Sequence, residues 1–190
     1  MKKLIFISLT VLQSYSPLLL SQDLQFYRED IVFRTSSDSM DVDAVYYFVN
    51  VGEKNINTML YYPFPENTRS LIDSISIADA QTGQTIEYID GTWGVNFNII
   101  VPSYGQASRH VFFRQKIQDN YFKYILTSTS TWGRALEFAN FVLQVPVNLS
   151  VDSLSYTPDT SYIKDETRYY YWKKMDFMPE KDFEVHFKNP

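Results

Sequence analysis

Short apolar runs recur along the chain from Asp23 onward, and none of them keeps a helical period. They return about every eight to fifteen residues, separated by turn residues, and no window holds a 3.6-residue period for three turns. The segment from Val95 to Val101 alternates at period two, as a strand does. The 15 Tyr and 14 Phe residues also favour strands. The sequence therefore predicts an all-β fold, an antiparallel β-sandwich of about ten to twelve strands.

The first 22 residues have the layout of a secretory signal peptide. A basic start, M-K-K, precedes an apolar stretch and a small residue near Ser21. Polar residues and a proline at positions 13–17 interrupt the apolar run before it reaches the length of a membrane-spanning helix, which leaves an uncleaved anchor as the weaker alternative. We expect a leader at residues 1–22, a mature domain at residues 23–190 with no membrane span, and export to the periplasm, the cell surface or the medium of a bacterium.

Cysteine is absent, and the charge balance is acidic. A chain without Cys has no disulfide framework, thiolate metal site or cysteine nucleophile. Removing Lys2 and Lys3 with the leader takes the formal net charge from −5 to −7. Such a charge disfavours nucleic acid and anionic membrane surfaces as partners. We expect no cofactor.

The stretch from Asp43 to Pro65 is the densest strand signal. Two apolar runs, Val45 to Val51 and Ile56 to Tyr62, flank a polar turn, V-G-E-K-N, and a Pro-Phe-Pro exit closes the second run. This arrangement predicts a β-hairpin. Because apolar residues fill both phases of V-Y-Y-F-V, we expect its first strand to be central and covered on both faces.

Other segments predict further strands and leave two alternatives open. Leu24 to Arg28 and Ile31 to Thr35 read as a first pair of strands, and Tyr121 to Trp132 as one long strand. Ala135 to Phe141 has a helical alternative, although its Phe residues and the V-L-Q-V-P that follows favour a strand. Two stretches that run from Thr-Trp-Gly to Val-Pro hint at two stacked halves joined near residues 118–120.

Catalytic and metal-binding signals are weak. His110 and His186 lie in the polar phase of alternating strands, and neither a G-x-S-x-G nor an S-x-x-K motif is present. The acids gather in turn-rich segments, where solvated side chains are typical, and two of them could still form a glycosidase pair. Asp38, Asp41 and Asp43 lack the spacing and the glycine of a calcium loop. We therefore predict no catalytic residue and no metal site. The acid clusters are Asp38, Asp41 and Asp43; Asp159, Asp165 and Glu166; and Glu180, Asp182 and Glu184.

Aromatic residues near turns are the strongest functional signal. Exposed Tyr and Trp side chains stack on sugars and peptides and are frequent binding hot spots, although core packing explains many of them equally well. In the run Tyr169 to Trp172, alternate residues share a face, so that one pair is core and the other is available for binding. The candidate binding residues are Trp93, Tyr104, Trp132, Arg134, Tyr170 and Trp172.

Three segments carry a resemblance. V-Y-Y-F-V-N followed by a polar turn and N-T-M-L-Y-Y-P-F-P resembles the start of the vault/inter-alpha-trypsin-inhibitor (VIT) type of β-domain and of a group of exported bacterial β-domain proteins without an assigned activity. Y-F-K-Y-I-L-T-S-T-S-T-W-G-R-A-L and W-K-K-M-D-F-M-P-E-K-D-F-E-V-H-F are similar to later segments of that bacterial group. The resemblance implies an all-β sandwich in the cell envelope and no catalytic residue. We expect no metal-dependent adhesion domain after this β-domain, so the adhesive partners of large VIT proteins are not implied.

The sequence as a whole favours a non-enzymatic module of the cell envelope or the medium. Its loops and exposed aromatic residues would bind a protein or a glycan. Two alternatives stay open: a carbohydrate-active enzyme that uses two loop carboxylates, and a structural accessory subunit of an envelope assembly. Neither the ligand nor the oligomeric state follows from the sequence.

Overall fold

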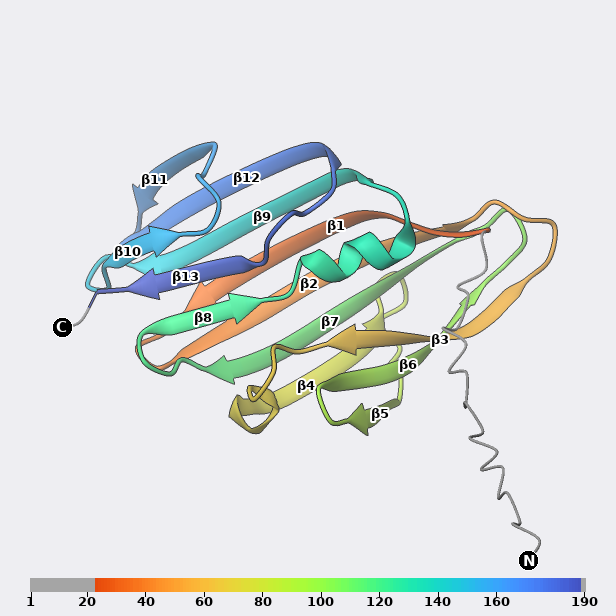
Figure 1. Cartoon of the computed structure of the whole chain (residues 1–190), viewed down its shortest axis with the longest axis horizontal. Helices are drawn as coiled ribbons and strands as arrows, with labels where there is room; N and C mark the ends of the chain where they lie inside the picture. Colours follow the sequence, from red (N-terminus) through yellow and green to blue (C-terminus); the bar gives the residue numbers. More distant parts are fainter. Residues whose placement is uncertain (1–22, 189–190) are drawn as a thin grey trace, which may run out of the picture.

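One seven-stranded sheet runs through the protein and forms its rear layer in Figure 1. The structure is a computed structural model that describes residues 23–188. Within them lie thirteen strands and two short 3-10 helices. The large sheet has the spatial order β11 (Thr160–Lys164), β12 (Thr167–Phe177), β9 (Leu136–Pro146), β1 (Leu24–Thr35), β2 (Ser39–Asn50), β7 (Gln106–Lys116) and β4 (Ile72–Asp79).

Two three-stranded sheets form a second layer over one face of the large sheet (Figure 1). The helix η2 (Thr127–Trp132) crosses the same face between them, and η1 (Arg69–Leu71) precedes β4. One small sheet has the order β10 (Val151–Leu154), β13 (Phe183–Phe187) and β8 (Tyr121–Tyr124), and the other has the order β3 (Ile56–Pro63), β6 (Gly94–Val101) and β5 (Tyr88–Gly91).

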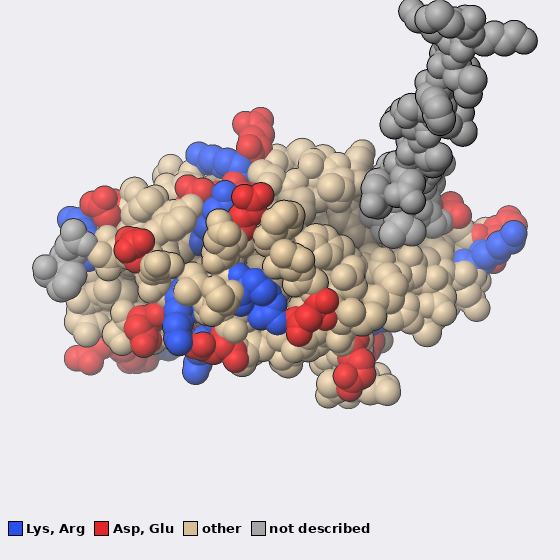
Figure 2. Space-filling model, turned by 60° about the horizontal axis from the view of Figure 1, so that its bottom comes forward, with Lys and Arg blue, Asp and Glu red and all other residues tan. Residues whose placement is uncertain are grey.

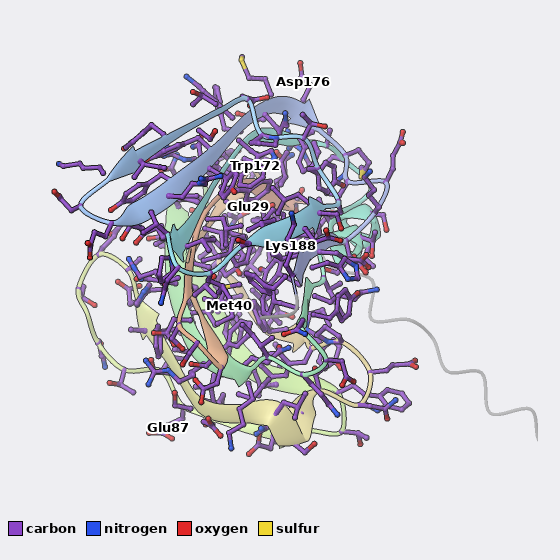
Figure 3. The ribbon with its side chains drawn as sticks, turned by 90° about the vertical axis from the view of Figure 1, so that its left-hand side faces the viewer. Glu29, Met40, Glu87, Trp172, Asp176 and Lys188 are labelled. Carbon is purple, nitrogen blue, oxygen red and sulfur yellow. The ribbon has the colours of Figure 1, made fainter. Side chains whose placement is uncertain are left out.

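Aromatic side chains fill the space between the layers. Phe33 of β1 stacks on Phe183 of β13, with ring centroids 4.5 Å apart, and Trp172 meets Phe183 edge-on at 5.2 Å. Figure 3 shows Glu29, Met40 and Trp172 inside the protein, all buried. Since tilted and offset ring contacts stabilise beyond the area that they bury, this cluster holds the small sheets to the large one.

The strand β2 alternates as its sequence predicts. Every second residue from Met40 to Asn50 is buried against the small sheets, and the residues between are half-buried. Its neighbours β1 and β7 confirm that β2 is central. The prediction that both faces are fully covered holds only for the inner face.

The sheet topology corrects two predictions and refines a third. The fold is mostly β, but it is not wholly antiparallel, because β1 and β9 run parallel. The two runs expected to form a hairpin are strands that do not pair with each other: β2 lies in the large sheet and β3 pairs with β6. The strands before residue 118 and those after residue 120 lie on opposite sides of the β1–β9 pairing in the large sheet, and each small sheet draws its strands from one of these two parts. The two predicted halves are therefore present, and they lie side by side in one continuous sheet. Long-range pairings of this kind leave no local pattern in the sequence.

Two strand boundaries also differ from the prediction. Leu24 to Thr35 is a single strand with a bulge, rather than two strands. The predicted long strand from Tyr121 ends at Tyr124, and the Ser- and Thr-rich part that follows becomes η2. The helical alternative for Ala135 to Phe141 is wrong, because β9 covers this segment from Leu136 onward.

Local hydrogen bonds explain why η2 is not a strand. The hydroxyls of Ser130 and Thr131 donate to the carbonyl oxygens three residues back, at 2.8 and 2.7 Å. At the start of the helix, the carboxylate of Asp182 accepts hydrogen bonds from the backbone N–H groups of Leu126 and Thr127. Side-chain bonds to the nearby backbone compete with a sheet ladder, and Gly133, at φ 67°, ends the helix.

Replacing Phe183 with Ala should destabilise the protein by about 3–5 kcal/mol, because the substitution leaves a cavity where three aromatic rings meet. The free energy of unfolding from urea titration measures the effect. The control is Ile163→Ala in β11, where the side chain is 57% exposed and the expected change is within about 0.5 kcal/mol. Equal losses in the two variants would contradict this account of the core.

Candidate ligand-binding cleft

A cleft opens between β3 and η2, two elements that lie side by side over the large sheet (Figure 1). Its outer part has a volume of about 350 Å³. Met59, Tyr61 and Pro63 of β3 form one wall, and Ser128, Thr131 and Trp132 of η2 form the other. Most of its lining surface is apolar, which is typical of ligand sites.

Two aromatic side chains shape the outer part. Tyr61 is 54% exposed, and Trp132 is half-buried. The indole of Trp132 packs on Phe26 and Phe48, with centroid distances of 5.7 and 5.6 Å. Since these core rings fix its position, Trp132 offers a rigid aromatic surface to the cleft.

A smaller inner part of about 70 Å³ continues the cleft toward the large sheet. Both parts share Leu60, Tyr61, Pro63, Ser128 and Trp132 in their walls, so the inner part lies behind the outer one. Glu29 and three tyrosines, Tyr46, Tyr62 and Tyr124, line this inner part.

The bulge in β1 places Glu29 there. Phe26 pairs with Phe48 and Arg28 with Tyr47, which leaves Tyr27 as an extra residue. The extra residue shifts the alternation by one, so the buried face changes from even to odd positions and Glu29 points inward with Ile31. Its neighbours across the sheet are Tyr46 on β2 and Ala139 on β9.

The three tyrosine hydroxyls form a closed triangle of hydrogen bonds. The Tyr46 hydroxyl lies 2.9 Å from that of Tyr62 and is also hydrogen-bonded to that of Tyr124, and the Tyr62 hydroxyl donates to Tyr124 at 3.2 Å. All three side chains are buried, and burial raises the pKa of each hydroxyl. The triangle is therefore neutral at ordinary pH.

Glu29 is the unusual group in the cleft. The residue is 2% exposed, and its Oε1 atom has no hydrogen-bond partner. Burial, with a smaller contribution from the neighbouring charge of Asp30, raises the pKa of the Glu29 carboxyl to about 8. A buried acid without a partner is costly to the fold, which makes such a group a functional candidate.

The predicted binding residues do not converge. Trp132 lines the cleft, and Arg134, two residues further, hydrogen-bonds to Gln25 and to Glu137. Trp93 is 53% exposed in the turn between β5 and β6, and Tyr104 is 68% exposed at the opposite end of β6.

In β12, Tyr170 and Trp172 were predicted to be available for binding, but the other pair of aromatic residues lies on the solvent side. Trp172 is 1% exposed, its indole N–H donates to the carbonyl of Tyr156, and Tyr170 packs on the core. Tyr169 and Tyr171 instead stack with Tyr162 of β11 on the outer face, at 5.2 and 5.5 Å. Trp172 is thus a core residue, and the surface aromatics of this hairpin are the three stacked tyrosines.

Five acids of the predicted clusters form ion pairs, namely Asp41, Asp43, Asp159, Asp182 and Glu184, and Asp43 also contacts a histidine. Asp41 binds Arg114, and Asp43 lies 2.7 Å from His110 and 2.8 Å from Arg34. Among residues 23–188, no group of three or more His, Cys, Asp or Glu side chains could hold a metal ion. The face shown in Figure 2 mixes acidic and basic side chains over one half and is nearly free of them over much of the other.

Sequence reasoning missed Glu29 and Tyr61. A signal for Glu29 was present, since the alternation that starts at Leu24 and Phe26 changes phase before Ile31 and Phe33. A bulge between them would have placed Glu29 inside. For Tyr61 and the tyrosine triangle, the contacts join strands far apart in the sequence, and no local pattern reports them.

The comparisons place the fold among known architectures. No protein-family model matches the sequence, and no curated protein matches it. A candidate nutrient binding protein from Legionella pneumophila superposes with a TM-score of 0.68 at 11% identity, over 87% of this chain and 67% of that one. An M1 zinc metallopeptidase from Deinococcus radiodurans superposes with a TM-score of 0.52 at 8% identity, over 86% of this chain, which spans 42% of the peptidase chain. At these identities the likeness shows the fold alone.

Replacing Glu29 with Gln should remove most of the pH dependence of stability. In the folded protein the carboxyl keeps its proton up to about pH 8, whereas in the unfolded chain it loses it near pH 4.5, its ordinary pKa. The folded state therefore holds an extra proton between these values, and its stability falls as pH rises through them, by on the order of 5 kcal/mol.

Urea unfolding at pH 5, 7 and 9 measures this slope. The matched control is Glu137→Gln, whose side chain is 51% exposed and which should keep the wild-type slope. An unchanged slope in the Glu29 variant would show that the Glu29 carboxyl ionises normally in the folded protein.

Proposed function

We propose that this chain is an exported, non-enzymatic β-sandwich module that binds a ligand with a flat apolar face, such as a sugar ring or an aromatic peptide side chain. The observation that carries the proposal is the cleft with Tyr61 on one wall and a fixed Trp132 on the other. Two aromatic surfaces supplied by different elements are a common way to hold such a face. The basic and apolar start of the sequence supports export.

The comparisons are consistent with a binding role. The Legionella protein that shares the fold is described as a candidate nutrient binding protein. The peptidase that shares it belongs to a larger chain, which this one only partly covers. Membership in the exported bacterial group with the VIT-type start is part of the same proposal. None of the helices formed by residues 23–188 is long and apolar enough to cross a membrane.

A second candidate function, docking in an envelope assembly, rests on the edge strand β11. All five of its residues are exposed, and its outer edge has no neighbouring strand in the large sheet. An open edge with the stacked Tyr162, Tyr169 and Tyr171 beside it could accept a strand from another protein. The carbohydrate-active enzyme would need two carboxylates facing one cleft. The aromatic cleft is lined by one, Glu29, whereas a separate cleft of about 510 Å³ is lined by Glu66, Asp119 and Asp182, of which Asp182 is paired with Lys123.

Replacing Trp132 with Ala should weaken ligand binding by about tenfold or more, because the substitution removes a rigid aromatic wall. Ligand-observed NMR with a panel of disaccharides and aromatic tripeptides identifies the ligands, and titration gives their affinities for the mature chain. Tyr61→Ala should weaken the same ligands.

The control is Trp93→Ala, which removes an exposed tryptophan that does not line the cleft. It should leave every affinity unchanged. Ligands that respond to Trp93 and ignore Trp132, or a panel without any ligand, would contradict the proposal.

A further inference from the structure

The inner part of the cleft offers hydrogen-bond acceptors and few donors. The Oε1 atom of Glu29 faces no donor in the protein. The hydroxyls of Tyr46, Tyr62 and Tyr124 can each donate one hydrogen bond, and the triangle contains three hydrogen bonds, so each hydroxyl donates to another member. The phenol donors are therefore used among themselves, while lone pairs on their oxygens remain. Apart from the single proton of the neutral Glu29 carboxyl, the hydrogens for bonds to these acceptors must come from the N–H or O–H groups of the ligand.

The walls around these acceptors favour a positive charge. Phe26, Phe48, Tyr46 and Trp132 present aromatic rings to the inner part. Ring faces attract cations, most strongly where water is excluded. Of the side chains from residues 23–188 that line the two parts of the cleft, none is Lys, Arg or His, so the protein supplies no cation of its own to Glu29.

The dimensions set the size of the group that enters. About 70 Å³ accepts a small head group, and the outer part of about 350 Å³ accepts a ring-sized body between Tyr61 and Trp132. An ammonium group has three N–H donors and one charge in a compact volume. A carboxylate or phosphate head could accept a hydrogen bond only from the proton of the neutral Glu29 carboxyl, and it would otherwise face the lone pairs of the phenols and the electron-rich faces of the rings.

We propose that the cleft binds a primary organic amine, with its ammonium group against Glu29 and the tyrosine triangle, and its apolar body between Tyr61 and Trp132. This inference rests on the proposed ligand-binding function of the cleft and adds the chemical class of the ligand.

Binding of the amine displaces a proton. Near neutral pH the carboxyl of Glu29 is protonated, because burial raises its pKa to about 8. The groups that face it are the neutral hydroxyls of Tyr46 from β2, Tyr62 from β3 and Tyr124 from β8, and its neighbour Asp30 is paired with Arg28. When the ammonium arrives, Glu29 gives its proton to solvent and keeps the negative charge. Amine affinity therefore rises with pH between about 6 and 8.

Calorimetric titration with matched probes tests the inference. The probes are 2-phenylethylamine, its neutral analogue 2-phenylethanol and the anion phenylacetate, each at pH 6.5 in buffers of different ionisation enthalpy. The mature wild-type protein should bind the amine at least about tenfold more tightly than the alcohol and release about one proton per bound amine. Phenylacetate should bind most weakly.

The Glu29→Gln variant separates the acid from the rest of the cleft. It should lose the preference for the amine and the proton release, while it binds 2-phenylethanol as the wild type does, which also shows that its cleft is intact. Glu137→Gln is the matched control and should behave as wild type in every titration.

The other outcomes are equally informative. If the amine and the alcohol bind equally well and Trp132→Ala weakens both, the inference is overturned and the proposed function stands. If amine binding releases no proton, or persists in Glu29→Gln, the assignment of Glu29 is wrong. If none of the three probes binds the wild type, the inference is overturned, while binding of saccharides and peptides is decided separately by the NMR panel.

Discussion

Three tyrosine hydroxyls meet at the point where the three sheets of this protein come together. Tyr46 belongs to the large sheet, Tyr62 to one small sheet and Tyr124 to the other, and their hydrogen bonds close a triangle. Buried polar groups are tolerated when they satisfy one another, and a satisfied network fixes one arrangement of its members. The position of β3 relative to η2, and hence the cleft between them, depends on this junction.

Glu29, unlike the three tyrosines, is a buried polar group with an unsatisfied oxygen atom. The bulge at Tyr27 points the Glu29 side chain into the core, next to Tyr46, where its Oε1 atom has no hydrogen-bond partner. The fold retains a buried acid where an apolar side chain of similar size would be more stable. Such a cost at the floor of an open, aromatic-walled cleft fits a group kept for binding, and the proposal of an amine ligand follows from it.

Local patterns in the sequence predicted the positions of many strands, but they did not predict how the strands pair into sheets. Val95 to Val101 is a strand as its alternation predicts, and the turn residues around it mark its ends. The segment after Tyr124 is helical partly through its own Ser and Thr hydroxyls and partly because Asp182, far along the chain, accepts hydrogen bonds from its first backbone N–H groups. The parallel pairing of β1 with β9 and the separation of β2 from β3 are equally non-local. Of the predicted site residues, Trp132 lines the cleft, whereas Trp172 is buried in the core. Alternation along a strand shows which residues share a face, but it does not show which of the two faces is covered by the rest of the protein.

The ionisation of Glu29 is the centre of this account, since the pH dependence of stability and the proton released on amine binding both depend on it. The most direct measurement is an NMR titration of the side-chain carboxyl carbon of Glu29 in the mature protein, assigned with the Glu29→Gln variant. The account predicts a midpoint of about 8 and a fall in that midpoint when an amine is bound. A midpoint near 4.5, the ordinary value for glutamate, would contradict it.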